Sequence, residues 1–172
     1  LLHVMLCRAL GAARVVAVDP MAERRQRATE LGADVTLNPD ADDVPDRVRE
    51  LTGGHGADVA VVACPVPAAQ EEALGLLAVA GRLSLFAGLP KGSDPIRFDS
   101  NSVHYRNLRV TGTTGGTVGN YRAAAAMVGS GRLDLEQVVS DVFALGELAA
   151  AYDTTMAGAA GKVVIVNETG ND

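Results

Sequence analysis

The chain has 172 residues, a net charge of −6 and 48% hydrophobic side chains, but only three Phe, three Tyr and no Trp. This acidic balance, with scattered Lys and Arg, argues against nucleic acid or an anionic membrane as a partner, and no segment reaches the ~20 apolar residues of a membrane span. The length allows one α/β domain and part of a second, with Ala, Val and Leu filling the core.

The first segment, residues 1–10, is almost wholly apolar and has neither an initiator Met nor an N-cap residue. It also lacks the basic flank and cleavage site of a signal peptide. We interpret it as a helix that packs against a sheet and is already under way at Leu1. The chain is therefore expected to begin just after the segment that would identify it.

The next run, residues 14–19, is apolar and β-branched and ends on Asp19, directly before Pro20. It predicts a buried strand followed by a helix that Asp19 caps, with Pro20 at its first position and its end at Leu31 and Gly32. A carboxylate at a strand tip also suits the ribose hydroxyls of an adenine dinucleotide, and its charge would repel a 2′-phosphate. The two roles are compatible, and the second favours NAD over NADP.

Further apolar runs alternate with helical segments. The runs are nearly continuous in apolar residues, which is typical of parallel strands covered on both faces. The alternation predicts βαβ units with right-handed crossovers, and hence an α/β fold with a doubly wound parallel sheet. Strands are expected at 34–38, 58–64, 82–87 and 108–113, and helices at about 43–52 and 67–79.

The alternation is expected to stop after Thr113, where a glycine- and threonine-rich bend covers residues 112–119. We place a domain boundary near 114–118. No further βαβ unit is predicted beyond it, and the polar tail from Asn167 is expected to fray. Helices are expected at about 120–130 and 146–157, and a strand at 162–166.

Small residues follow two of the predicted strands, as Ala63-Cys64-Pro65 and Ala87-Gly88-Leu89. Ligands of open α/β sheets bind beyond the carboxyl ends of strands, where small side chains let a flat ring approach the backbone. Cys64, Ala87, Gly88 and Leu89 are therefore candidate cofactor-binding residues; ordinary strand-to-loop turns are the alternative. Arg24 could reach the adenosine near Asp19, or could be a solvated charge.

Catalytic and metal-binding groups are sparse. Cys7 and Cys64 lie far apart, each in an apolar run, and are expected to be small buried side chains in a reducing cytoplasm; a disulfide or metal pair is the alternative. The three histidines do not cluster into the four-ligand set of a structural zinc site, and no serine has a nucleophile-elbow setting. The residues alone predict no catalytic group and no metal ligand in this chain.

Taken in order, several segments resemble the cofactor domain of the zinc-dependent medium-chain alcohol dehydrogenases. The stretch 101–113 is most similar to the sorbitol/iditol polyol-dehydrogenase branch of that family. The other matching segments are residues 1–19, Glu30-Leu31-Gly32-Ala33-Asp34, Gly56-Ala57-Asp58-Val59, Gly81-Arg82 and Phe86-Ala87-Gly88-Leu89-Pro90.

The resemblance implies an NAD-binding Rossmann domain over residues 1–115 and, over 116–172, a segment that returns to the catalytic domain. The glycine-rich phosphate turn and the first strand would then precede Leu1, so that strands 14–19 and 58–64 lose a shared neighbour and the chain alone is expected to be unstable. Within the family, the residues matching Asp19 and Arg24 bind the ribose, those matching Ala87, Gly88, Leu89, Thr113 and Thr114 line the nicotinamide half, and the one matching Lys162 lies near the pyrophosphate.

The resemblance also implies an activity for the parent protein: hydride transfer between NAD and a secondary, polyol-like alcohol or its ketone. Zinc would be held by an N-terminal catalytic domain outside this chain, the assembly would be a homo-dimer or homo-tetramer, and this chain alone would be inactive. Gly115-Gly116 stands where polyol dehydrogenases often carry Arg-Tyr, so threonine dehydrogenase-like or simple secondary-alcohol substrates stay open. Two other classes remain as alternatives: a non-catalytic truncated nucleotide-binding fragment and an adenosylmethionine-dependent methyltransferase.

Overall fold

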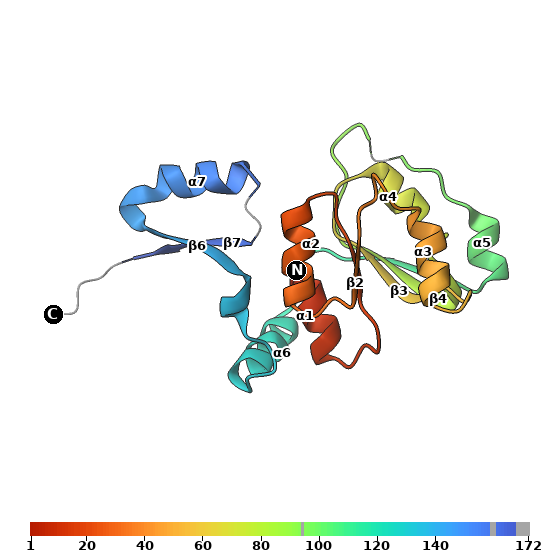
Figure 1. Cartoon of the computed structure of the whole chain (residues 1–172), viewed down its shortest axis with the longest axis horizontal. Coiled ribbons are helices and arrows are strands. Elements are labelled where there is room, and N and C mark those ends of the chain that lie inside the picture. The colour runs from red at the N-terminus through yellow and green to blue at the C-terminus, as the bar shows by residue number, and fades with distance from the viewer. Residues whose placement is uncertain (94, 159–160, 168–172) are drawn as a thin grey trace. The chain divides into compact units, whose positions relative to one another are not determined.

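The computed structural model describes residues 1–93, 95–158 and 161–167 (Figure 1). Its strands form three parallel sheets, β1–β2, β3–β4–β5 and β6–β7. This confirms the predicted α/β class with parallel pairing, a Rossmann-like arrangement. The chain divides into two compact units, Leu1–Asp40 with Val118–Asp172, and Ala41–Thr117. The predicted domain boundary at 115/116 stays a prediction.

The first unit contains two parallel strand pairs. β1 pairs with β2, and β6 pairs with β7. Its core contains Val4 and Met5 from the first helix, Ala28 and Leu31 at the second, and Val138 from a short 3₁₀ segment. The elements are α1 (Leu2–Ala9), β1 (Val16–Val18), α2 (Ala22–Glu30), β2 (Val35–Leu37), α6 (Val118–Gly129), 3₁₀ segments Leu135–Val138 and Leu145–Glu147, β6 (Val139–Ala144), α7 (Leu148–Met156) and β7 (Lys162–Val166).

A single carboxylate connects three elements of this unit. Asp34 Oδ2 accepts a hydrogen bond from the Val15 amide at 2.7 Å, and Asp34 also pairs with Arg8 of α1. Arg8 Nε donates to the Gly32 carbonyl at 2.6 Å. The Val15 amide first, and the Arg8 guanidinium next, hold the pKa of Asp34 below its usual value. The end of α2, the start of β2 and α1 are therefore tied together by charge-assisted bonds.

Two predictions for this unit are wrong. The helix after Asp19 begins at Ala22 rather than Pro20, because Asp19 Oδ1 accepts from the Met21 amide at 2.9 Å and closes a local turn before the helix starts. The prediction that βαβ units stop after Thr113 also fails, since β6, α7 and β7 form one, with α7 packed on both strands. The predicted fraying of the tail from Asn167 concerns residues that lie mostly outside the described ranges.

The second unit is a three-stranded parallel sheet with helices between its strands. Its core gathers Leu77 and Leu83 of the central strand with Val62, Leu74 and Leu108. The elements are α3 (Val44–Leu51), β3 (Ala57–Val62), α4 (Pro67–Glu72), β4 (Leu77–Leu85), α5 (Ser100–Tyr105) and β5 (Arg109–Gly112). The predicted strands at 58–64 and 108–113 and the predicted helix at 43–52 are confirmed within two residues or so.

The helix predicted at 67–79 is wrong over its second half. It ends at Glu72, and the chain turns to start β4 at Leu77, where the Ala57 amide donates to Leu76 O at 2.8 Å. Leu77 is only 1% exposed, so burial and sheet pairing override the helical preference of this alanine- and leucine-rich stretch. The strand predicted at 82–87 therefore begins five residues earlier.

The expectation of buried cysteines is wrong for Cys64. This side chain is exposed, because β3 already ends at Val62 and Cys64 falls in the following loop. Cys7 is half-buried and packs against the core of the first unit. Both cysteines carry free thiols. None of the helices within the described ranges has the length and apolar character of a membrane span.

Candidate cofactor-binding site

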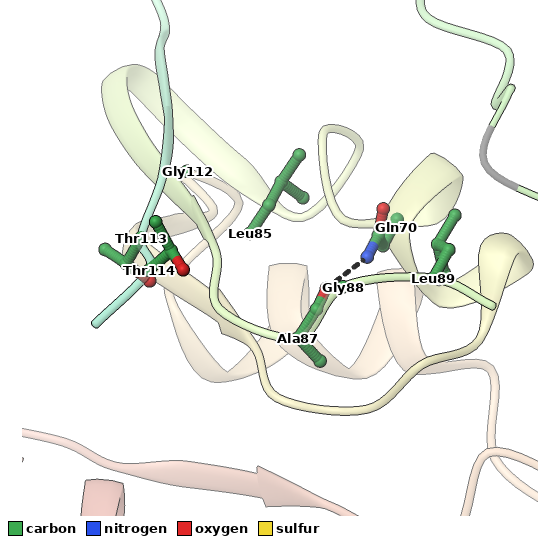
Figure 2. A pocket seen from close by; sticks show the side chains of 8 residues that line it. All are labelled: Gln70, Leu85, Ala87, Gly88, Leu89, Gly112, Thr113 and Thr114. Carbon is green, nitrogen blue, oxygen red and sulfur yellow. Dashed lines mark hydrogen bonds between the residues drawn. The ribbon is translucent and has the colours of Figure 1, made fainter. Parts of the chain in front are cut away.

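A cavity of about 380 Å³ opens at the carboxyl ends of β4 and β5 (Figure 2). Leu85 and Gly112, the last residues of these strands, pair with each other and stand at its base. Strand ends of this kind are where open parallel sheets bind ligands. The lining residues are Gln70, Leu85, Ala87, Gly88, Leu89, Gly112, Thr113 and Thr114. Five of these eight are residues singled out from the sequence.

Backbone hydrogen bonds hold the loop that leaves β4. The amides of Phe86 and Ala87 both donate to the Val62 carbonyl of β3, each at 3.0 Å. On the other side of Ala87, in the Ala87–Gly88 peptide, Gln70 Nε2 of α4 donates to the Ala87 carbonyl at 2.9 Å (Figure 2). Thr113 donates its amide to the Leu85 carbonyl at 3.4 Å. The walls of the cavity are thus set by main-chain geometry.

Two glycines of the lining have no internal reason to be glycine. A Cβ built on Gly88 or Gly112 would meet no other atom within 4 Å, and neither residue has a positive φ. Glycine is usually retained for a special backbone conformation or for a close approach. Because both glycines line the cavity, the missing side chains leave space for a group that enters it.

The chemistry of the lining suits a flat, weakly polar ring. Leu85, Ala87 and Leu89 provide apolar surface, whereas Thr113 and Thr114 add hydroxyl groups. None of the eight lining residues carries an ionisable side chain. A site of this composition can bind and orient a ligand but offers no general acid or base of its own.

The carboxylate at the end of β1 belongs to the first unit. Asp19 Oδ1 accepts from the Met21 amide, and Oδ2 lies 3.9 Å from Arg24 Nη1. At that distance, with the Asp19 side chain 30% and the Arg24 side chain 39% exposed, Oδ2 can still accept hydrogen bonds from a ligand. Arg25 Nη1 donates to the Asp19 carbonyl at 2.8 Å, which fixes the backbone beneath the carboxylate.

Lys162, at the start of β7, shares this neighbourhood. Asp19, Arg24 and Lys162 all lie close enough to the backbone nitrogen of Leu1 for their charges to act there. Arg24 Nη2 would also lie 3.9 Å from a Cβ placed on Gly158, in the turn that follows α7. The structure therefore brings Lys162 to the neighbourhood of Asp19 and Arg24, from which it is separated by 143 and 138 residues of sequence.

The cavity lining differs from the strand-end residues predicted from the sequence. One of those residues does not line the cavity, and three lining residues were not predicted. Cys64 lies in the loop after β3 and is not part of the cavity lining. Gln70, Leu85 and Gly112 were missed. Gln70 gave no distinct sequence signal, because Glu71 and Glu72 follow it and a helix of six residues is too short for a periodic pattern.

The described residues hold no cluster of side chains that could bind a metal ion. Across residues 1–93, 95–158 and 161–167, no three His, Cys, Asp or Glu side chains come close enough together to hold a metal ion. Every buried side-chain nitrogen or oxygen in these ranges has a hydrogen-bond partner.

Parallel strands joined by helices, with a ligand-sized cavity beyond the carboxyl ends of two of them, define a Rossmann-like domain of the nucleotide-binding class. Comparison with known proteins makes the assignment specific. Residues 1–130 match the zinc-binding dehydrogenase family, and the chain belongs to this family, the zinc-dependent medium-chain alcohol dehydrogenases.

Individual relatives agree with this assignment. The L-threonine 3-dehydrogenase of Pyrococcus abyssi is 32% identical over 96% of this chain, and that of Bacillus subtilis is 29% identical over 96%. The chain spans 48% of the length of each. Among solved structures, the alcohol dehydrogenase from Thermus sp. ATN1 matches with a TM-score of 0.87 and 27% identity, covering 95% of this chain and 46% of that one. A zinc-binding dehydrogenase from Sinorhizobium meliloti 1021 bound to NADP has a TM-score of 0.87 and 26% identity, covering 96% and 48%.

Proposed function

We propose that this chain is the cofactor-binding part of an NAD-dependent oxidoreductase that transfers hydride between NAD and a secondary alcohol. The observation that carries the proposal is the cavity beyond β4 and β5, where Gly88 and Gly112 leave open space next to an apolar wall. In this proposal the cavity takes the nicotinamide ring. Asp19 and Arg24 take the adenosine ribose, and Lys162 lies toward the pyrophosphate.

Each group of residues has a distinct task in this proposal. Leu85, Ala87 and Leu89 exclude water from one face of the ring, and Thr113 and Thr114 offer hydroxyl groups to its polar substituent. The bound cofactor supplies the hydride acceptor, and zinc, held by residues outside this chain, polarises the alcohol oxygen as a Lewis acid. The residues of this chain bind and orient.

The choice of NAD over NADP depends on charge at the end of β1. The Asp19 carboxylate is half-exposed and only weakly paired at 3.9 Å with Arg24, so it can accept both ribose hydroxyls and would repel a 2′-phosphate. The Sinorhizobium relative is bound to NADP, which makes this preference a property to be measured for the present chain.

The experiment measures dissociation constants of NADH and NADPH by titration calorimetry on the complete polypeptide that carries this sequence. Asp19→Ser is expected to weaken NADH by about tenfold, as for the loss of a charge-assisted hydrogen bond, and to reduce the discrimination against NADPH. Asp40→Ser, another acidic residue of the first unit, serves as the matched control. Unchanged preference in Asp19→Ser would contradict the assignment of the ribose site.

The substrate is proposed to be a secondary alcohol, with three subclasses to separate: a polyol, a hydroxy amino acid and a simple secondary alcohol. The expected polyol class has no added support, whereas the L-threonine 3-dehydrogenases among the relatives favour a hydroxy amino acid. NADH formation in the presence of L-threonine, of sorbitol or of a simple secondary alcohol distinguishes these subclasses. NADH binding without turnover of any of the three would favour the alternative of a non-catalytic nucleotide-binding protein.

A further inference from the structure

One polar side chain is buried next to the cavity without an evident place in the proposed function. Gln70 is 4% exposed, and within the described residues it is the single polar residue that is buried. It lies on α4, and the buried residues that directly follow this helix are Ala73 and Leu74, which are 1% and 4% exposed. A short helix that covers a sheet would ordinarily place an aliphatic side chain there.

Burying an amide is costly unless its polar atoms are bonded. Gln70 meets this condition through Nε2, which donates to the Ala87 carbonyl at 2.9 Å across 17 residues of sequence. The bond joins α4 to the first loop residues after β4, not to another helix or to the sheet interior. Its partner, Ala87, is itself part of the cavity wall.

The bond fixes the orientation of a peptide plane. The Ala87–Gly88 peptide is trans, so its C=O and N–H point in opposite directions. With the Ala87 amide held by Val62 O and its carbonyl held by Gln70, both ends of this residue are fixed. Gly88 has no side chain to pack, and a Cβ there would meet nothing within 4 Å, so neighbouring contacts do little to fix this peptide.

We propose that Gln70 is a positioning residue for the nicotinamide end of the cofactor: its amide orients the Ala87–Gly88 peptide that forms one wall of the cavity. This inference rests on the proposed function, because it takes the cavity as the nicotinamide site. Gln70 acts through the main chain at Ala87. It is therefore distinct from the residues that contact the adenosine end.

If Gln70 had a role in packing alone, a different effect on ligand binding would be expected. If Gln70 only filled space between α4 and β4, an apolar side chain of the same length would preserve the cavity. If the donated bond orients the peptide, losing the donor weakens only ligands that enter the cavity. NADH and ADP-ribose separate these cases, because ADP-ribose has the adenosine and pyrophosphate but no nicotinamide.

The experiment uses the complete polypeptide and measures the dissociation constants of NADH and ADP-ribose by titration calorimetry. Gln70→Met keeps the length without a donor, and Gln70→Leu removes the amide and leaves an apolar side chain. Leu74→Val is the matched control, a mild packing change just after the same helix. Urea unfolding of each variant establishes that it is folded at the temperature of the titration.

We expect both Gln70 variants to bind NADH about three- to tenfold more weakly, as for one lost hydrogen bond, and ADP-ribose within about twofold of the parent protein. Leu74→Val should change neither the NADH nor the ADP-ribose dissociation constant. Equal losses for the two ligands, or no loss for either, would overturn the inference while leaving cofactor binding intact. A parent protein that binds neither ligand would instead refute the proposed function, and the inference with it.

Discussion

A substitution at Gly112 distinguishes effects on folding from effects on binding. Gly112→Ala should raise the free energy of unfolding but lower the affinity for NADH. Gly112 pairs with Leu85 as the last residue of β5. Its φ is not positive, and a Cβ would meet nothing within 4 Å. Gly112→Ala therefore adds no clash within the chain and reduces the conformational entropy of the unfolded state. We expect the free energy of unfolding to rise by about 0.4–1 kcal/mol.

The added methyl group should instead clash with a ring that enters the cavity. Overfilling a closely packed site costs about 1–3 kcal/mol, which corresponds to about five- to 150-fold in the NADH dissociation constant. Stability is measured by urea unfolding, and binding by calorimetry with NADH and ADP-ribose. In Gly112→Ala, only the binding of NADH should weaken, and the binding of ADP-ribose should stay the same.

The matched control is Gly129→Ala at the end of α6, where a Cβ also meets nothing within 4 Å and φ is not positive. It should leave binding unchanged and not lower stability. Lower stability in Gly112→Ala would show that the open space inferred from the structure is wrong. Full NADH affinity in a stabilised Gly112→Ala variant would show that the ring does not enter this cavity.

Two further predictions concern stability. The pKa of Asp34 is lowered in the folded protein, chiefly by the Val15 amide, so its contribution is present above the ordinary carboxyl pKa of about 3.9 and is lost as pH falls through the lower folded value. Asp34→Asn should flatten the urea midpoint against pH in that acidic range; an unchanged slope would rule out the linkage. Gly81→Ala should destabilise by about 1–3 kcal/mol, because its Cβ would lie 2.8 Å from the Ala78 carbonyl; a urea midpoint equal to the parent's would contradict this.

Strand ends were the part of the site that the sequence predicted best. Ala87, Gly88 and Leu89 follow an apolar run, and parallel strands bring their carboxyl ends to one edge. Thr113 and Thr114 were expected there only through the resemblance to the dehydrogenase family. Their gathering around one cavity follows from that topology. Gln70 could not be found in this way, because its contact with Ala87 depends on which face α4 turns inward, and a helix of six residues gives too short a periodic pattern.

The errors have local physical causes. β6 was not predicted because Ser140 and Asp141 interrupt its apolar run; Ser140 and Val142 are exposed in the structure, so the strand lacks the continuous burial that marks the others. α5 was overlooked despite a visible cap, since Asp99 Oδ1 accepts from the amides of Asn101 and Ser102. Cys64 was predicted as buried because the apolar run continues past Val62, whereas hydrogen-bonded pairing with β4 does not.

The composition of the cavity is consistent with the division of labour in the proposed reaction. Hydride transfer moves a hydrogen with both its electrons from one carbon to another, so the nicotinamide end needs a fixed orientation and a dry surface rather than a proton acceptor. The eight lining residues include apolar, hydroxyl and amide side chains with no ionisable group. The proton that leaves the alcohol must then be accepted by residues outside this cavity.

A variant that damages only the cavity, such as Gly112→Ala, should therefore lower the affinity for NADH without shifting the pH at which turnover by the complete polypeptide is half-maximal. A shifted pH profile would place the proton-transfer group in contact with this cavity. It would contradict the separation of cofactor orientation from proton transfer.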